Sequence, residues 1–228
     1  MTKVGFISLG CSKNLVDTEV MLHKLHSAGF EITPDESEAE IIIINTCGFI
    51  DSAASEAIDN ILQTARLKEA GLVGKILVTG CLSQRYQEEI MKEMPEVDGV
   101  LGTGSYTQIV PAIEALLEEN TVSRFDSIDT PEQETGRILT TPEHYAYIKI
   151  AEGCDNRCSY CIIPYLRGKF RSRQMDDVLY EARMLAASGV KELIVVAQDT
   201  SRYGIDLPGH NRLLPQLLQE LCKVQTLL

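Results

Sequence analysis

The stretch Ile41-Ile42-Ile43-Ile44, followed by Asn45-Thr46-Cys47, decides the fold. Four consecutive β-branched residues without alternation predict a strand that is buried on both faces, as inner strands of parallel sheets are. Short apolar runs on either side alternate with stretches of helical periodicity, which predicts βαβ units and an α/β fold with a doubly wound parallel sheet. The expected strands are Val4–Leu9, Phe30–Thr33, Ile41–Ile44, Lys75–Thr79 and Val97–Leu101, and the expected helices are Leu15–Ala28, Asp51–Ala70, Gln84–Glu93 and Tyr106–Glu118.

The composition changes after this first part of the chain. Residues 119–142 are rich in Glu, Asp, Thr, Ser and Pro, which indicates a linker. We therefore predict a domain boundary near Leu139, with one domain at 1–139 and a second at 140–228. The second domain is expected to hold strands Tyr145–Ala151 and Glu192–Ala197 and helices Gln174–Ser188 and Leu213–Lys223. Two strand–helix units cannot close a barrel, so they form either a small sheet or the front part of a larger domain.

Charge and cysteine usage limit the class of protein. The formal net charge is -12, from 33 acidic and 21 basic residues. Proteins that bind nucleic acid through phosphate contacts are usually basic. Nucleic acid is therefore not expected as the main partner, and the charge permits a basic protein partner. The sequence shows no membrane span and no signal peptide. An odd number of cysteines, 7 in all, without the dense spacing of secreted scaffolds predicts a reducing cytoplasm.

Three cysteines lie close together in a C-x3-C-x2-C loop that follows a predicted strand. They are Cys154, Cys158 and Cys161, named here the loop triad. A structural zinc site needs four ligands, and no fourth Cys or His lies nearby. Three thiolates on a four-iron cluster leave one iron open to bind a substrate or cofactor. An iron–sulfur site is therefore preferred over a zinc knuckle or a chance grouping.

Three more cysteines each follow a different predicted strand of the first sheet. They are Cys11, Cys47 and Cys81, named here the edge triad. One such cysteine alone is usually a small buried hydrophobe. The carboxyl ends of parallel strands meet at one edge, however, and each cysteine stands beside a glycine that permits close backbone approach. The pattern predicts that the three thiols converge on one metal centre.

These stretches resemble a known family of enzymes. Residues 152–161, Glu-Gly-Cys-Asp-Asn-Arg-Cys-Ser-Tyr-Cys, resemble the motif of the radical S-adenosylmethionine (SAM) superfamily, and residues 162–173 resemble its methylthiotransferase branch. Residues 10–19 and the stretches ending in Cys47 and Cys81 match the N-terminal domain of that branch. The resemblance implies a [4Fe-4S] cluster with an open iron at each triad. It also implies that the second domain is the first part of a partial TIM-like radical-SAM barrel.

The resemblance further implies roles for the cofactor sites. The cluster of the loop triad would bind SAM and cleave it to a 5'-deoxyadenosyl radical, with Tyr160 packed near the adenine. The cluster of the edge triad would hold the sulfur that is methylated and transferred. Gln198 ends a strand on the presumed active edge and is a second candidate for cofactor binding. No side chain is predicted as a catalytic acid or base, since the cofactor supplies the radical.

Two subgroups of the family compete. The tRNA-modifying MiaB type typically reads Gly-Cys-Gln-Met-Asn near its first cysteine, whereas this chain reads Gly10-Cys11-Ser12-Lys13-Asn14. That is closer to the RimO type, which adds a methylthio group to the β-carbon of an aspartate in a small-subunit ribosomal protein. The expected partners are this basic protein and an electron donor. Family members are about twice as long and end in a TRAM domain, so a truncated chain, and with it a non-catalytic iron–sulfur module, is a further alternative.

Two local features have alternative interpretations. The basic run Arg167, Lys169, Arg171 and Arg173 either contacts SAM, substrate or cluster, or forms a solvated loop. Asn14 is expected to cap the helix that follows the first cysteine.

Overall fold

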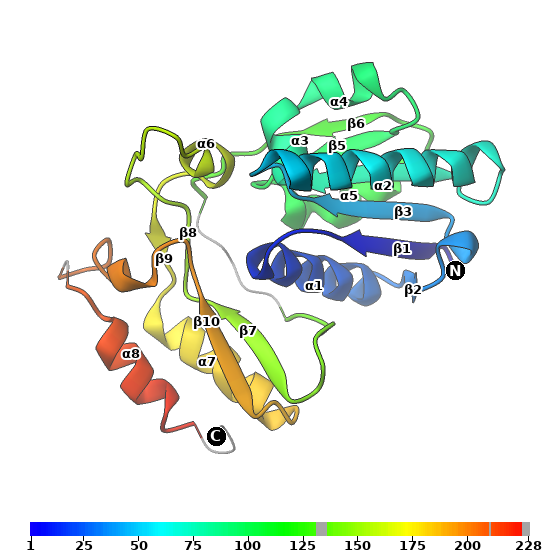
Figure 1. Ribbon diagram of the computed structural model, residues 1–228. Helices are drawn as coiled ribbons and strands as arrows, with labels where there is room; N and C mark the ends of the chain where they lie inside the picture. The colour runs from blue at the N-terminus through cyan, green and yellow to red at the C-terminus, as the bar shows by residue number, and fades with distance from the viewer. Residues whose placement is uncertain (131–135, 210, 225–228) are drawn as a thin grey trace. The chain divides into compact units, whose positions relative to one another are not determined.

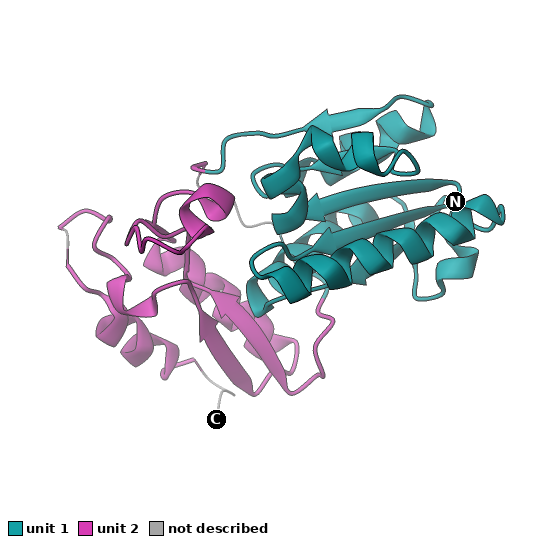
Figure 2. Cartoon of the chain, turned by 45° about the horizontal axis from the view of Figure 1, so that its top comes forward, with its two compact units in different colours: residues 1–128, 135–138 teal, residues 129–134, 139–228 magenta. Residues whose placement is uncertain are grey.

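The chain folds into two compact units. The computed structural model describes residues 1–130, 136–209 and 211–224 (Figure 1). Unit 1 comprises residues 1–128 and 135–138, and unit 2 comprises residues 129–134 and 139–228 (Figure 2).

Unit 1 is built on a parallel sheet, as predicted. Its strands, in the spatial order β2-β1-β3-β4-β5-β6, are β1 (Lys3–Ser8), β2 (Glu31–Thr33), β3 (Ile41–Thr46), β4 (Lys75–Gly80), β5 (Gly99–Leu101) and β6 (Val122–Arg124). Every neighbouring pair runs parallel. The four isoleucines of β3 are fully buried, which confirms the inner strand that decides the fold.

Helices cover both faces of this sheet (Figure 1). They are α1 (Ser12–Ser27), α2 (Asp51–Glu69), α3 (Cys81–Tyr86), α4 (Glu88–Glu93) and α5 (Ile109–Leu117), with short 3-10 turns η1 (Glu36–Glu38) and η2 (Tyr106–Gln108). Ile41 and Ile43 pack in one core with α1 and α5, while Ile42 and Ile44 pack in the other with α2, α3 and α4. The alternation of one strand between two apolar cores is the physical basis of the doubly wound fold.

Several predicted boundaries in unit 1 were wrong. The helix expected at 84–93 is two helices, because Gln87 takes a positive φ of 47° between them. The last predicted helix begins as the 3-10 turn η2 before α5. The expected linker starts too early, since β6 lies inside it and pairs with β5. A three-residue edge strand with no fully buried side chain has too little apolar pattern to be recognised from sequence.

Unit 2 contains the two predicted strand–helix units. Strands β7 (Tyr145–Lys149) and β10 (Glu192–Val196) pair in parallel, and β8 (Ala151–Glu152) pairs antiparallel with β9 (Arg171–Ser172). The helices are α6 (Ile163–Arg167), α7 (Met175–Ala187) and α8 (Leu214–Leu221), with the 3-10 turn η3 (Thr200–Arg202). Side chains of β7, α7 and α8 share one buried core. The short elements α6, β8 and β9 flank the cysteine loop and were not predicted.

Candidate metal centres

The edge triad lies at one edge of the sheet of unit 1. Cys11 is the N-cap of α1 just beyond β1, Cys47 directly follows β3, and Cys81 directly follows β4. Because β1, β3 and β4 are neighbours in the sheet and run parallel, their carboxyl ends place the three cysteines along one edge.

Close backbone contacts join the three cysteine segments. A Cβ atom added to Gly10 would lie 2.7 Å from Cys47 Cβ and 3.3 Å from Cys47 Sγ. A Cβ atom added to Gly48 would lie 2.8 Å from Leu82 Cα and 3.2 Å from the carbonyl carbon of Cys81. Both positions are tighter than a side chain tolerates. Glycine therefore lets the first cysteine segment approach the second, and the second approach the third.

Gly80 shows the same requirement more strongly. Its φ is 95°, and an added Cβ atom would lie 2.4 Å from the carbonyl oxygen of Thr46. A positive φ is strained for any residue with a Cβ atom, so both sterics and backbone conformation select glycine before Cys81.

A buried polar layer fixes the spacing of the first two cysteines. Asn14 is 1% exposed and its side-chain amide donates to the carbonyl oxygens of Leu9, at 2.8 Å, and Thr46, at 3.1 Å. These residues come just before Cys11 and Cys47. The predicted cap was therefore wrong: α1 begins at Ser12, and Asn14 sits inside the helix as a tie between two strand ends.

A second amide supports this layer from β3. Asn45 donates from its side chain to the backbone oxygen of Asn14 at 2.8 Å and to Thr18 Oγ1 at 2.9 Å. Thr18 in turn shares a hydrogen bond of 2.8 Å with Ser8 Oγ at the end of β1. The ends of β1 and β3 are thus held to α1 and to each other by side chains that satisfy buried polar groups.

The donor set of the edge triad fits an iron–sulfur cluster. All three cysteines are free thiols, with Cys11 exposed, Cys47 half-buried and Cys81 buried. Among the described residues, no three Cys, His, Asp or Glu side chains are gathered as ligands of a single metal ion. A cluster places each thiolate on a different iron and so needs adjacent rather than coincident sulfurs. Three adjacent cysteine segments with one thiol open to solvent meet that need.

The loop triad lies between β8 and α6 in unit 2. Cys158 is exposed, while Cys154 and Cys161 are half-buried. Two backbone hydrogen bonds of 3.0 Å fold the loop, from Cys154 N to Gly168 O and from Cys161 N to Cys158 O. Arg157 has a positive φ of 53°, which turns the chain inside the motif. Three soft donors on one short turn again fit a cluster with one iron left open.

A clamp from the 3-10 turn η3, which follows β10, holds the outer part of this loop. Arg202 Nη1 donates to Asp155 Oδ1 at 2.5 Å and to Asn156 Oδ1 at 2.8 Å, and its guanidinium lies 4.9 Å from the ring centre of Phe170. Asn156 also donates to Asp199 at 3.3 Å. The pKa of the Asp199 carboxyl is lowered, first by the hydrogen bond from the Ser201 hydroxyl and further by the one from Asn156.

Glu152 is a buried charge at the entrance to the loop. Its side chain is 5% exposed and lies 3.5 Å from Lys149 Nζ and 3.3 Å from Arg167 Nη1. Its Oε1 atom accepts from Gly153 N at 2.9 Å and from Gln198 Nε2 at 2.5 Å. Sequence reasoning did not single out this residue, although it precedes the first cysteine of the motif.

The two predicted cofactor-binding residues, Gln198 and Tyr160, differ in burial. Gln198 follows β10 on the same carboxyl edge as the loop, and its Oε1 atom is buried with no hydrogen-bond partner among the described residues. A buried amide oxygen without a donor is costly, so it marks a place where a ligand can donate. The ring of Tyr160 is 89% exposed and presents its surface to solvent. Its predicted place near an adenine stays a prediction.

The basic run is not simply a solvated loop. Arg167 and Arg173 are buried, and Arg173 donates to Lys149 O and to Glu181 Oε2, both at 2.6 Å. Arg171 donates to the backbone oxygens of Arg167 and Lys169. The hydrogen bonds of these guanidinium groups hold the segment 167–173, which follows the loop triad, in place.

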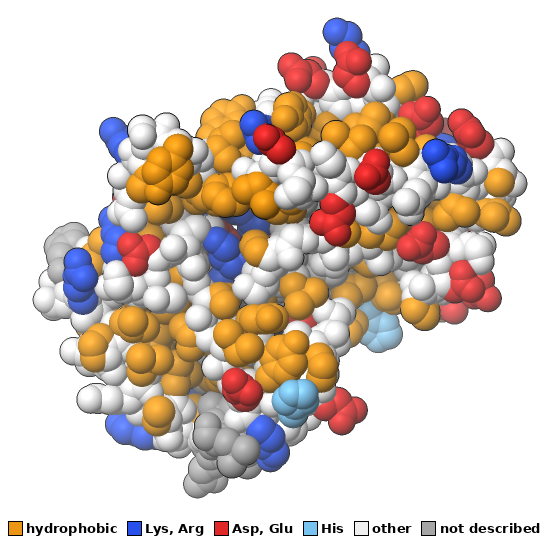
Figure 3. All heavy atoms as spheres, viewed as in Figure 1, with side chains coloured by type: hydrophobic (Ala, Val, Ile, Leu, Met, Phe, Trp, Pro, Cys, Tyr) orange, Lys and Arg blue, Asp and Glu red, His pale blue; other side chains and the backbone are white. Residues whose placement is uncertain are grey.

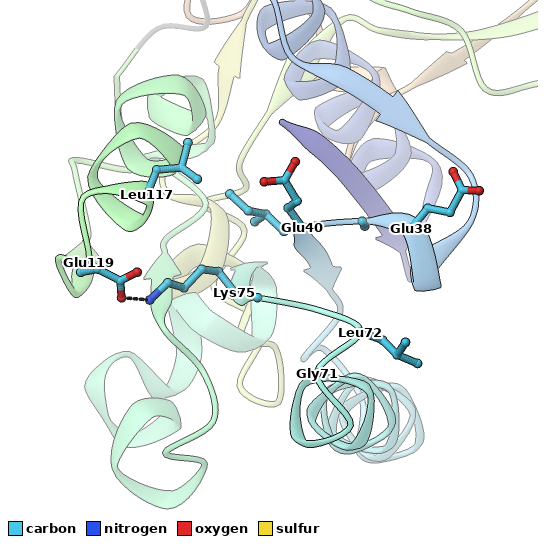
Figure 4. A pocket seen from close by; sticks show the side chains of 10 residues that line it. Glu38, Glu40, Gly71, Leu72, Lys75, Leu117 and Glu119 are labelled. Carbon is cyan, nitrogen blue, oxygen red and sulfur yellow. Dashed lines mark hydrogen bonds and ion pairs between the residues drawn. The ribbon is translucent and has the colours of Figure 1, made fainter. Parts of the chain in front are cut away.

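A separate hollow of about 340 Å³ lies on unit 1 at the opposite edge of the sheet. It is lined in part by Glu38, Glu40, Leu72 and Leu117, and Lys75 reaches across to Glu119 at 2.5 Å (Figure 4). Lys75 and Ile41 begin their strands, so the hollow lies at the amino ends, away from the cysteines. The residues that line this hollow include none of the cysteines of the two triads.

Among the helices of the described residues, none is both long and apolar enough to cross a bilayer.

Comparisons with known proteins find matches to two family models along the chain. Residues 3–102 match the uncharacterized protein family UPF0004, and residues 148–221 match the Radical SAM superfamily. The Ribosomal protein uS12 methylthiotransferase RimO of Clostridioides difficile (strain 630) is 50% identical over 225 residues, which cover 98% of this chain and 50% of that protein. The protein of the same name from Caldanaerobacter subterraneus subsp. tengcongensis is 53% identical over 228 residues, 100% of this chain and 52% of that protein.

A solved structure shares the fold at low sequence identity. The radical S-adenosylmethionine methyltransferase TsrM from Kitasatospora setae superimposes with a TM-score of 0.63 at 13% identity, covering 96% of this chain and 51% of that chain. The chain spans about half the length of the curated relatives it matches. The resemblance to radical-SAM methylthiotransferases that the motifs predicted is confirmed.

Proposed function

We infer that this chain is a radical-SAM methylthiotransferase sequence of the RimO type, since its relatives of that name match it at about half identity over its whole length. We propose that the protein adds a methylthio group to the β-carbon of an aspartate in the ribosomal protein uS12. The observation that carries this proposal is the presence of two three-cysteine sets, one on a sheet edge and one on a loop. Each set leaves one iron of a four-iron cluster without a protein ligand.

In this proposal each unit carries one cluster site, and the boundary between the two domains lies near Leu139. Cys11, Cys47 and Cys81 would hold one [4Fe-4S] cluster in unit 1, and the loop triad would hold the other, together with SAM, in unit 2. When bound, the clusters and SAM supply the one-electron chemistry that breaks an unactivated C–H bond, which no side-chain base can do. The protein binds and orients these groups.

Individual residues of unit 2 have positioning tasks toward SAM. The buried Oε1 atom of Gln198 would accept a hydrogen bond from an N–H of the SAM amino group, which is a donor of the required kind. The exposed ring of Tyr160 supplies a stacking surface for the adenine. Arg202 keeps the loop in place through Asp155 and Asn156.

The surface charge favours a basic protein as substrate. Exposed acidic side chains lie over the region where Figure 1 draws α2 and α4, as Figure 3 shows. The exposed acidic residues of α2 and α4 include Glu56, Asp59, Glu69, Glu88 and Glu89. Opposite charge steers a basic ribosomal protein toward such a surface and repels tRNA phosphates. The protein works in the cytoplasm, where the ribosome is, and takes electrons from a separate donor.

The test begins with anaerobic reconstitution and a count of iron and sulfide per chain. About eight irons, with loss of about four after Cys154→Ala, Cys158→Ala and Cys161→Ala together, is the expected result for two clusters. The matched triple variant at Cys11, Cys47 and Cys81 should lose the other four. One stoichiometric zinc, or no iron, would overturn the cluster assignment.

A second step tests the substrate. The reconstituted protein is incubated with SAM, sulfide and dithionite, together with uS12 or with tRNA. A methylthio group on an aspartate of a uS12 peptide, detected by mass spectrometry, supports the proposal. Modified tRNA instead would favour the MiaB-like alternative. Eight irons without any modified product would mean that this chain is an iron–sulfur module.

A further inference from the structure

The amide of Gln198 is held in one orientation by a carboxylate. An amide side chain can present either its oxygen or its NH2 group to a neighbour. Here the neighbour is Glu152 Oε1, an acceptor, and Gln198 Nε2 donates to it at 2.5 Å. Turning the amide over would bring two oxygen atoms together beside a negative charge. The amide oxygen of Gln198 must therefore face away from Glu152.

Glu152 is itself fixed by strong partners. Lys149 at 3.5 Å and Arg167 at 3.3 Å flank its Oε2 atom, and both side chains are buried. The backbone N–H of Gly153 donates to Oε1 from the first residue of the cysteine loop. With cations on one oxygen and neutral donors on the other, the carboxylate cannot rotate freely.

From this geometry we propose that Glu152 is a positioning residue for SAM. It orients the Gln198 amide so that only a hydrogen-bond donor, such as an amino N–H, is accepted at its oxygen. The same carboxylate oxygen binds Gly153 N–H, so the ligand site is aligned with the start of the loop triad. This inference rests on the proposed function, because it deepens the role given there to Gln198.

A simpler role for Glu152 would be to neutralise the buried cations Lys149 and Arg167. Shortening the side chain separates the two roles. Glu152→Asp keeps the negative charge but moves the carboxylate back by one methylene, so it cannot reach both Gly153 N–H and Gln198. If charge balance were the only role, this variant would bind SAM like the wild type.

The main experiment measures SAM affinity by equilibrium dialysis, with labelled SAM, reconstituted full chain and no reductant. We expect Glu152→Asp to bind SAM about tenfold more weakly, as for loss of a hydrogen bond to a charged group. Gln198→Met should weaken binding at least as much. The double variant should be no weaker than Gln198→Met alone, because Glu152 acts through Gln198. Wild-type affinity in Glu152→Asp, or multiplicative effects in the double variant, would overturn the proposal.

A matched control uses another buried ion pair of unit 2. Glu181 contacts Arg173 at 2.6 Å and its side chain is 12% exposed. Glu181→Asp makes the same chemical change on α7 and should leave SAM affinity within about twofold. Iron content and far-UV circular dichroism should match the wild type in all variants.

A readout without cofactor keeps the proposal testable on its own. In the full chain labelled with ¹⁵N-glutamine, the side-chain amide signal of Gln198 is identified by its loss in Gln198→Met. We expect this signal to shift in Glu152→Asp and to stay unchanged in Glu181→Asp. An unshifted signal in Glu152→Asp would refute the positioning role. Failure of the wild-type protein to bind SAM would instead refute the proposed function.

Discussion

Replacing Asn14 by alanine should loosen the edge triad. The change removes two hydrogen bonds, to Leu9 O and Thr46 O, and leaves both carbonyl groups beside a side chain that is 1% exposed in the native structure. A buried acceptor left without its donor costs about 1 kcal/mol or somewhat more. We therefore expect unit 1 to lose about 2 to 3 kcal/mol of stability against opening.

Hydrogen exchange followed by mass spectrometry measures this loss where it arises. A cost of about 2 kcal/mol corresponds to roughly thirtyfold faster exchange in peptides that cover residues 9–20 and 41–50. Because these segments carry Cys11 and Cys47, the reconstituted variant should also release iron from the edge triad faster. Iron at the loop triad should be unaffected.

Asn60→Ala is the matched control for this prediction. Asn60 also donates from its side chain to a backbone oxygen, that of Glu56 at 2.8 Å, but this bond is exposed on the surface of α2. Alanine also has the higher helix propensity, so we expect a change within about 0.5 kcal/mol. If Asn14→Ala exchanged no faster than Asn60→Ala, the reasoning that the polar layer holds the strand ends would be refuted.

Three further predictions concern unit 2. Arg202→Ala should raise exchange in residues 153–161 severalfold without lowering global stability, because a partly exposed ion pair contributes about 1 kcal/mol or less; unchanged exchange would contradict the clamp. The pKa of Asp199 is lowered in the folded state. The stability that its ionised carboxylate contributes is therefore complete above the ordinary pKa of 3.8, and it is lost as the pH falls through the lower pKa of the folded state. Exchange in the same loop should therefore rise only in acid, and Asp199→Asn should remove that dependence. Burial raises the pKa of Tyr203 to about 12 from 10.0. The stability that its neutral hydroxyl contributes is therefore complete below pH 10 and is lost as the pH rises towards 12. Urea midpoints should fall over that range in the wild type and less in Tyr203→Phe.

The sequence was a good guide where one segment carries its own pattern. The run Ile41–Ile44 identified an inner strand because consecutive isoleucines place apolar side chains on both faces of a strand. An inner strand of a covered parallel sheet buries both faces. The glycines beside Cys11 and Cys81 correctly indicated close backbone approach, which the contacts of Gly10 and Gly80 confirm. The C-x3-C-x2-C spacing pointed to the loop without any knowledge of the fold.

Prediction failed where a side chain depends on distant partners. Asn14 has the chemistry of a helix cap, and only the fold shows that Thr46, from another strand, is its partner. Glu152 meets Gln198 across 46 positions, so no local rule connects them.

The two triads depend on structure at different scales. The edge triad takes one cysteine from each of three strands, so its geometry exists only when the sheet of unit 1 is complete. The loop triad lies within eight positions of sequence, Cys154 to Cys161, and needs only a turn that is pinned at its start by Glu152 and at its middle by Arg202. Local opening of unit 2 therefore disturbs the orientation of the loop before it disperses the thiols. In unit 1 any opening that separates β1, β3 and β4 disperses all three ligands at once. Buried amides accordingly reinforce the sheet edge, whereas the buried carboxylate of Glu152 and the partly exposed guanidinium of Arg202 hold the loop.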